Sequence, residues 1–277
     1  MHQFKHKSLT FCIHCKSKRL SRRKDTTLGY ENYRCKDCKR TFNQRSPTVF
    51  NNLDYPTDIV LLAVRRYLAY KLSYRDVAEI FLDSGLVVTY EAIREWVSKF
   101  APLLTEKFKQ KRKYKAGPSH YIDETYIRIK GKWVYVYRGI DRNGNLVNTM
   151  VSETRDMDAA KKFFSESEEV CGIPERVTTD GHSAYPRAIA EVNGTDVKHR
   201  VNGYLHNFTE QSHRPLKQRY YPMLGFKSLK GASIFCPAHD ELRNFFKPSS
   251  IKSFTPKQKR CIRASKIYSL NKIVENL

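Results

Sequence analysis

Alternating apolar and polar residues along positions 120–141 predict two neighbouring β-strands. The segment 130–132 interrupts the pattern, and Asp-Arg-Asn-Gly at 141–144 predicts the turn that ends the second strand. One carboxylate, Asp123, lies inside the first strand. A charged group in a half-buried strand costs free energy unless a cation or a function accompanies it, so Asp123 is a candidate functional residue.

Strand and helix patterns alternate through the rest of this region. Further strands are predicted at 146–152, 175–179 and 196–201, and helices at about 156–170, 183–191, 207–218 and 226–246. An antiparallel meander followed by alternating helices and strands predicts a mixed α/β sheet. In open sheets of this kind, ligands bind at the carboxyl ends of the strands.

Three short helices are predicted ahead of the sheet, at about 57–68, 73–81 and 89–100. Apolar residues of the third helix recur at helical spacing and should pack inward, which leaves other side chains facing outward. The outward-facing residues are Tyr90, Arg94 and Ser98. This arrangement resembles a helix-turn-helix whose recognition helix contacts the major groove of DNA through such residues. A three-helix bundle without DNA contact has a similar periodicity and remains an alternative.

Four of the seven cysteines form two Cys-x-x-Cys pairs, Cys12 with Cys15 and Cys35 with Cys38, separated by 19 residues. This spacing predicts one structural zinc ion bound by four thiolates in a zinc ribbon. His14 is not expected to be a ligand, because the four sulfurs fill the tetrahedral shell. The first 47 residues include 13 Lys or Arg and 3 Asp or Glu, a balance that favours contact with phosphates. A ribbon that contacts protein instead of DNA is the alternative.

The formal net charge is +23, from 51 Lys and Arg against 28 Asp and Glu, so polyanions are the expected partners. Nucleic acid is favoured over an anionic membrane surface, because the basic residues are spread over the whole chain. No apolar run approaches the ~20 residues that span a bilayer, and no secretory signal is visible. We therefore expect a soluble cytoplasmic protein with no membrane partner.

Three carboxylates lie where they could converge: Asp123 in the first strand, Asp180 at the end of strand 175–179, and Glu210 in a later helix. Because side chains alternate along a strand, Asp123 and Glu124 should point to opposite faces, and only one of them should join the cluster. Clustered carboxylates repel one another unless divalent cations neutralise them. Two magnesium ions about 4 Å apart would suit phosphodiester chemistry at such a site. The spacing alone also fits acidic residues that are simply solvated.

The residues around these carboxylates carry a family resemblance. The first block is Asp-Glu-Thr-Tyr-Ile at 123–127 with Lys-Gly-Lys-Trp at 130–133, the second is Val-Thr-Thr-Asp at 177–180 with Ala-Tyr-Pro at 184–186, and the third covers 207–219 and 222–228. In this order they resemble the catalytic blocks of bacterial DDE transposases of the insertion sequence six family. The resemblance extends over residues 55–246, and the third block is long and specific.

This resemblance implies a ribonuclease H-like, retroviral integrase-like catalytic domain. It implies that Asp123, Asp180 and Glu210 are the catalytic triad and bind two Mg²⁺ ions. Lys217 follows Glu210 by two helical turns and matches the basic residue with which such transposases contact the DNA strand being joined. Arg214 and Arg219 of the same helix are expected to contact DNA as well.

The expected fold class is α/β, with a mixed-sheet ribonuclease H-like domain preceded by a small zinc ribbon and an all-α helix-turn-helix. The expected ranges are 1–50 for the zinc ribbon, 51–117 for the helix-turn-helix, 118–246 for the catalytic domain and 247–277 for a basic tail. The tail has 8 Lys or Arg against one Glu, so it is expected to contact DNA or to be partly disordered.

The expected function is that of a DNA transposase that binds terminal inverted repeats, cleaves by water attack and transfers the freed 3′ hydroxyl to target DNA. The resemblance implies replicative transposition through a cointegrate, in bacterial cytoplasm and in association with the nucleoid. Two DNA ends must be brought together, so a homodimer or higher oligomer on double-stranded DNA is expected. The alternatives are a transposase-derived DNA-binding regulator without catalysis and a ribonuclease H-like nuclease on RNA–DNA hybrids.

Overall fold

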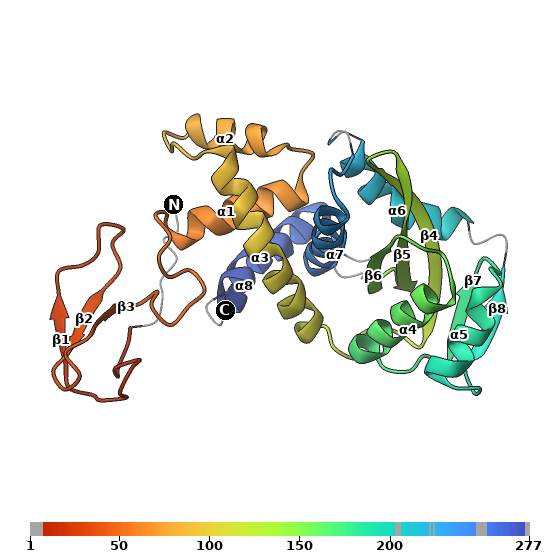
Figure 1. Ribbon diagram of the computed structural model, residues 1–277, viewed down its shortest axis with the longest axis horizontal. Coiled ribbons are helices and arrows are strands. Elements are labelled where there is room, and N and C mark those ends of the chain that lie inside the picture. Colours follow the sequence, from red (N-terminus) through yellow and green to blue (C-terminus); the bar gives the residue numbers. More distant parts are fainter. Residues whose placement is uncertain (1–7, 203–205, 222, 224, 248–253, 275–277) are drawn as a thin grey trace. The chain divides into compact units, whose positions relative to one another are not determined.

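The computed structural model describes residues 8–202, 206–221, 223, 225–247 and 254–274 (Figure 1). The side chains of residues 206–210, 271 and 274 lie outside this description. Every helix within the described part is too short or too polar to span a lipid bilayer. The chain divides into two compact units, which are treated one at a time. The four expected domain ranges remain predictions.

The first unit comprises residues 1–63 and 264–277, and its described part contains a small antiparallel sheet. Strands β1 (Leu20–Arg23), β2 (Asn32–Cys35) and β3 (Thr41–Asn43) pair in that order. Phe42 packs with two of the cysteines in a small buried cluster. So few apolar residues cannot stabilise the sheet alone, which makes a bound metal the expected source of its stability.

Two helices connect the units in sequence. Helix α1 (Thr57–Ala69) begins in the first unit and ends in the second, and α8 (Pro256–Val274) begins in the second unit and ends in the first. The basic tail expected from the charge pattern is therefore a helix where it is described, so the expectation of partial disorder is not met there. Residues 248–253 of that tail lie outside the described part.

Helices α2 (Tyr74–Leu82) and α3 (Tyr90–Lys111) pack against each other in the second unit. A capping box begins α2, since the backbone N–H of Asp76 donates to Ser73 Oγ and that of Ser73 donates to Asp76 Oδ2, at 3.1 and 2.7 Å. The expectation of a short third helix is wrong. Helix α3 has 22 residues, because Leu104 and Phe108 extend its buried face through the basic run.

The second unit, residues 64–263, is built on a five-stranded mixed sheet in the order β6-β5-β4-β7-β8. The strands are β4 (Ser119–Ile129), β5 (Lys132–Asp141), β6 (Leu146–Ser152), β7 (Arg176–Thr179) and β8 (Lys198–Val201). Strands β4, β5 and β6 form an antiparallel meander, while β7 and β8 run parallel to β4. This order with these directions is that of the ribonuclease H-like fold, so the expected fold class is confirmed.

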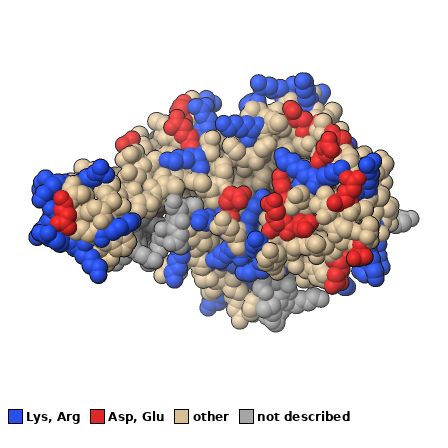
Figure 2. Space-filling model, turned by 60° about the horizontal axis from the view of Figure 1, so that its bottom comes forward, with Lys and Arg blue, Asp and Glu red and all other residues tan. Residues whose placement is uncertain are grey.

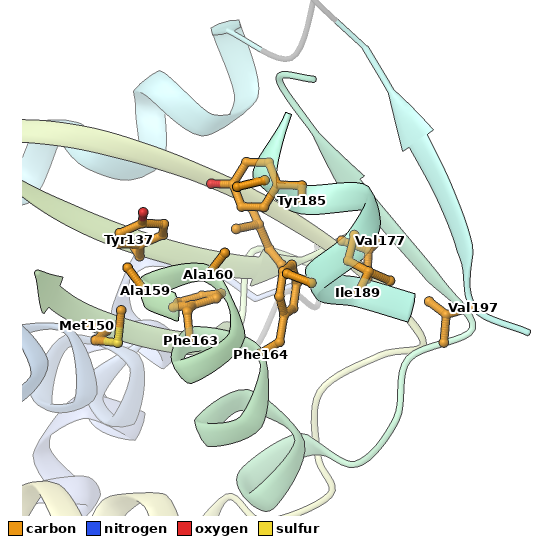
Figure 3. Packing of buried hydrophobic residues seen from close by; sticks show 13 residues of the cluster. Tyr137, Met150, Ala159, Ala160, Phe163, Phe164, Val177, Tyr185, Ile189 and Val197 are labelled. Carbon is orange, nitrogen blue, oxygen red and sulfur yellow. The ribbon is translucent and has the colours of Figure 1, made fainter. Parts of the chain in front are cut away.

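One face of the sheet is covered by α4 (Met157–Cys171) and α5 (Ala184–Asn193) (Figure 1). Figure 3 shows the apolar core between them, in which Phe163 and Phe164 of α4 and Tyr185 of α5 pack with Tyr137 and Val177 of the sheet. All five side chains are almost completely buried. This packing fixes the ends of β4 and β7 relative to each other.

The opposite face of the sheet packs against α6 (His206–Tyr220) and α7 (Leu229–Phe246). Adjacent residues of β6 point to opposite faces of the sheet. Met150 belongs to the apolar core on one face, whereas Thr149 donates a hydrogen bond to Asp240 of α7 on the other, at 2.7 Å. Asp240 also accepts from Arg138 of β5 at 2.7 Å, and both side chains are buried. A buried ion pair therefore holds α7 on the sheet.

Candidate active site and zinc site

The parallel pairing of β4 with β7 brings Asp123 and Asp180 together. The last registered pair joins Tyr121 with Thr178, and continuing it by two residues places Asp123 beside Asp180, just beyond the end of β7. Carboxylate oxygens of Asp123, Glu124 and Asp180 lie within 4.8 Å of one another. The two predicted aspartates therefore do converge at the carboxyl end of a strand.

The same cluster corrects the expectation that Glu124 points away from it. The strand does alternate: Glu124 lies opposite Tyr137, which faces the apolar core, and Asp123 lies opposite Arg138, which reaches α7. Strand β7 has ended at this level, and among the described residues the pairing of β4 with β7 stops at Tyr121. Carboxylates from both faces can consequently bend around the open edge of β4 and meet.

Arg155, in the loop before α4, links two of the three carboxylates. Its Nε and Nη2 donate to the two oxygens of Glu124 at 3.1 and 3.3 Å, and Nη2 also donates to Asp180 Oδ2 at 2.7 Å. Burial disfavours the charge of Arg155, but the hydrogen bond to Glu124 and the charges of both carboxylates outweigh burial and raise its pKa. The side chain of Glu124 is 1% exposed and that of Asp180 is 30% exposed. Arg155 thus neutralises the buried carboxylate of Glu124 and also contacts the partly exposed carboxylate of Asp180.

Backbone and side-chain groups orient both aspartates. Asp123 Oδ1 accepts the N–H of Glu124 at 3.0 Å, and Oδ2 lies 3.5 Å from Nε2 of His213, a buried residue of α6. Asp180 Oδ1 accepts the N–H of His182 at 3.0 Å. Local spacing does not bring His213 or Arg155 to this site, because their contacts join segments far apart in the chain. Glu124 was set aside only because of the alternation of side chains along the strand.

Helix α6 carries the other residues expected here and contacts β4 and β5. Glu210 lies in this helix, but its side chain is outside the described part, so its convergence with the aspartates remains a prediction. Arg214 is exposed and Lys217 is half-buried, positions from which both can reach a ligand. Their contact with DNA remains a prediction as well.

Arg219 does not fit the prediction of a DNA contact. It is 2% exposed, and its guanidinium lies 5.2 Å from the ring centroids of both Tyr67 and Phe235. Its Nη2 donates to the backbone oxygen of Tyr67 at 2.6 Å. Burial lowers the pKa of Arg219, although the neighbouring tyrosines counteract this effect. The residue joins α6 to neighbouring helices inside the molecule, where DNA cannot reach it.

The residues expected to face DNA from α3 are on its solvent-exposed side. Tyr90 is 38% exposed, and Arg94 and Ser98 are exposed too. Arg94 and Ser98 line a groove of about 510 Å³ together with Lys227, which precedes α7, and Lys230 in the first turn of α7. Figure 2 shows Lys and Arg side chains spread over much of the visible face, with Asp and Glu among them.

The four predicted zinc ligands form one cluster. Their sulfurs lie within 4.8 Å of one another, with Cys12 to Cys38 at 3.6 Å and Cys15 to Cys35 at 3.5 Å. Four sulfurs placed tetrahedrally at about 2.3 Å from zinc would be roughly 3.8 Å apart, so the spacing fits this ion. Burial opposes ionisation of Cys35, but backbone N–H groups of Cys38 and Asp37 outweigh burial and lower its pKa to about 6. A thiolate suited to zinc can therefore form near neutral pH.

Comparisons with known proteins bear on these sites. A family model described as a DDE domain matches residues 117–249. The transposase for insertion sequence-like element IS431mec of Staphylococcus aureus is 38% identical over 174 residues, 61% of this chain and 77% of that protein. The transposase for insertion sequence element IS257 in transposon Tn4003, also from Staphylococcus aureus, has the same identity and coverage. An uncharacterized protein in transposable element ISH50 of Halobacterium salinarum is 29% identical over 132 residues, 47% of this chain and 41% of that protein.

Among solved structures, the HTLV-2 integrase catalytic core domain in complex with magnesium matches with a TM-score of 0.36 and 11% identity, over 53% of this chain and 97% of that chain. The strand order and directions described above establish the ribonuclease H-like fold. The family is shown by the identity to the staphylococcal transposases, which extends over 77% of their length. The chain belongs to the insertion sequence six family of DDE transposases and carries their catalytic domain.

Proposed function

We propose that the protein is a DNA transposase that binds the terminal inverted repeats of an insertion sequence, cleaves the DNA at each end and transfers the freed 3′ hydroxyl to target DNA. One observation carries the proposal: Asp123 and Asp180 meet beyond the open end of β7. Phosphoryl transfer needs such carboxylates to hold divalent cations beside a substrate phosphate. The staphylococcal relatives are transposases of insertion sequences.

Asp123, Asp180 and Glu210 are the residues that would hold two Mg²⁺ ions. The donor set fits, since Mg²⁺ prefers a few carboxylate oxygens and keeps water in its remaining positions, and the side chain of Asp180 is 30% exposed. When bound, the ions activate the attacking oxygen and stabilise the leaving one. The N–H groups of Glu124 and His182 keep the two aspartates oriented before substrate arrives. A Zn²⁺ ion on the four cysteines would serve structure alone.

Double-stranded DNA is the proposed partner, both as element ends and as target. Tyr90, Arg94 and Ser98 of α3 would contact the inverted repeat, and Arg214 and Lys217 of α6 the strand at the catalytic centre. The net charge of +23 supplies sequence-independent attraction to phosphates. Because two ends must be joined, a homodimer or larger assembly is proposed, acting on the bacterial nucleoid.

Cleavage of labelled element ends tests the proposal. Purified protein would be incubated with duplex DNA from the element's ends in Mg²⁺, beside Asp180→Ala and a matched control, Asp196→Ala, whose carboxylate is exposed and distant from β7's end in sequence. Nicked and strand-transferred products that require Mg²⁺, persist in Asp196→Ala and disappear in Asp180→Ala are expected.

Two other outcomes would replace the proposal. Binding without products in Mg²⁺ or Mn²⁺, the same for both variants, would indicate a DNA-binding regulator without catalysis. Cleavage of RNA–DNA hybrids in preference to duplex DNA would indicate a ribonuclease H-like nuclease instead.

A further inference from the structure

Glu124 is an additional carboxylate at a centre that is expected to use three. Its oxygen lies within 4.8 Å of those of Asp123 and Asp180, so its position would suit a metal ligand. Both of its oxygens, however, already accept hydrogen bonds from Arg155, and its side chain is 1% exposed. A cation supplied by the chain thus occupies the place beside Glu124 that a metal ion could otherwise take.

We propose that Arg155 is a positioning residue of the catalytic centre, which withholds Glu124 from the metal ions and orients Asp180 toward them. The proposal rests on the proposed function, since it requires the aspartates to hold divalent cations. The guanidinium is suited to this role because its planar fork donates from Nε and Nη2 to one carboxylate side-on. The second hydrogen of Nη2 remains for Asp180, at 2.7 Å.

This arrangement has an electrostatic consequence for metal binding. The positive charge of Arg155 touches Asp180 directly and so disfavours a cation on the same carboxylate. Glu124 compensates for that charge and remains unavailable as a ligand. The two residues therefore have opposite effects on metal affinity, whereas two residues with a purely structural role would weaken metal binding together.

The opposite effects of Arg155 and Glu124 can be tested by measuring the Mn²⁺ affinity of the full-length, zinc-loaded protein without DNA. Electron paramagnetic resonance would measure the concentration of free Mn²⁺. Arg155→Gln removes the competing charge and frees Glu124, so affinity should rise about tenfold. Glu124→Gln leaves the charge of Arg155 uncompensated beside Asp180, so affinity should fall by a similar factor. The double variant, which replaces the ion pair with two neutral glutamines, should return toward the wild-type value.

Further variants keep the result interpretable. Circular dichroism would verify folding. If Arg155→Gln is destabilised because Glu124 is left buried without its counter-charge, the double variant, which has no charge at either position, replaces it in the comparison. Arg155→Lys keeps the charge without the fork and should give an affinity between wild type and Arg155→Gln. In Mg²⁺, Arg155→Gln should bind metal more tightly yet cleave DNA more slowly, because a fourth carboxylate alters the ligand set.

Shifts of the same sign in Arg155→Gln and Glu124→Gln, or no shift in either, would overturn the proposal while leaving the transposase function intact. Asp180→Asn separates the two claims, because it removes the charge of the proposed ligand while both hydrogen bonds from Arg155 to Glu124 can remain. Mn²⁺ binding that is the same in Asp180→Asn as in the wild type would overturn the metal site itself, and the role of Arg155 with it.

Discussion

The four sulfurs of the first unit and the carboxylates of the second could each bind metal ions. The two clusters differ in how much of the metal's coordination shell the protein fills. The sulfurs come from two Cys-x-x-Cys turns and are enough to fill a tetrahedral shell. The carboxylates of Asp123 and Asp180 leave positions for water and for phosphate oxygens, and Asp180 is partly open to solvent. A closed shell suits an ion that stabilises a fold, whereas an open shell suits an ion that takes part in a reaction. A structural metal site is thus distinguished from a catalytic one by whether the protein fills every ligand position, and less by the number of ligands.

Removing zinc should have the largest effect, and it should be confined to the closed cluster. Cys35→Ser, or a chelator, should unfold the sheet β1–β3, because binding of a structural zinc contributes on the order of 10 kcal/mol and the apolar cluster around Phe42 is small. Two-dimensional NMR of amide groups would follow the two units separately. Cys261→Ser, at an exposed free cysteine, is the matched control and should change nothing. Concurrent loss of the five-stranded sheet would contradict this separation.

Neutralising an aspartate of the open cluster should remove the reaction and spare the fold. Asp123→Asn keeps the side-chain volume but forfeits several kcal/mol of charge stabilisation, so strand cleavage should slow by on the order of a thousandfold or more. The free energy of unfolding should change by less than about 1 kcal/mol, because the substitution also relieves repulsion among neighbouring carboxylates. Gel assays of cleavage and urea unfolding measure the two quantities. Equal losses of activity and stability would make Asp123 a structural residue.

A carboxylate on the far face of the same sheet should behave in the opposite way. Asp240→Asn leaves the guanidinium of Arg138 buried without its counter-charge, so stability should fall by about 3–5 kcal/mol. Urea unfolding would measure the loss, with Asp196→Asn as an exposed control expected to stay within about 0.5 kcal/mol. A small change in Asp240→Asn would mean that solvent or another cation reaches the site.

The smallest predicted effect is a pH dependence of the free energy of unfolding, which arises from His120 in β4, outside both ligand clusters. Burial lowers the pKa of His120 to about 4, although Asp141 counteracts this effect. The unfolded chain takes up this proton below about pH 6.5, while the folded protein stays neutral there until about pH 4. Stability should therefore fall between pH 6.5 and 4, by up to about 3 kcal/mol from this group.

His120→Gln tests this assignment, because glutamine does not titrate in that range. Urea unfolding at pH 7 and pH 4.5 should show a smaller difference for the variant than for the wild type. An unchanged difference would assign the acid sensitivity to groups other than His120.

Local patterns predicted much of the secondary structure. Apolar alternation defined β4, β5 and β6, and the left-handed backbone at Lys130 and Gly131 confirms the turn expected between the first two. The capping box at Ser73 is likewise a local feature, because its partners are three residues apart. Helix α3 was predicted too short, since the basic side chains of the run 107–113 obscured the apolar residues between them.

By itself, the sequence determined the two Cys-x-x-Cys pairs, the order of strands and helices, and the motifs that contain the two aspartates, because each depends on residue type at short spacing. Tertiary structure alone decided which residues surround those aspartates. Arg155 meets Glu124 across 31 residues, and Arg219 lies between aromatic rings instead of facing DNA. Such contacts depend on where a strand ends and how helices pack on the sheet, which no local pattern of side chains encodes.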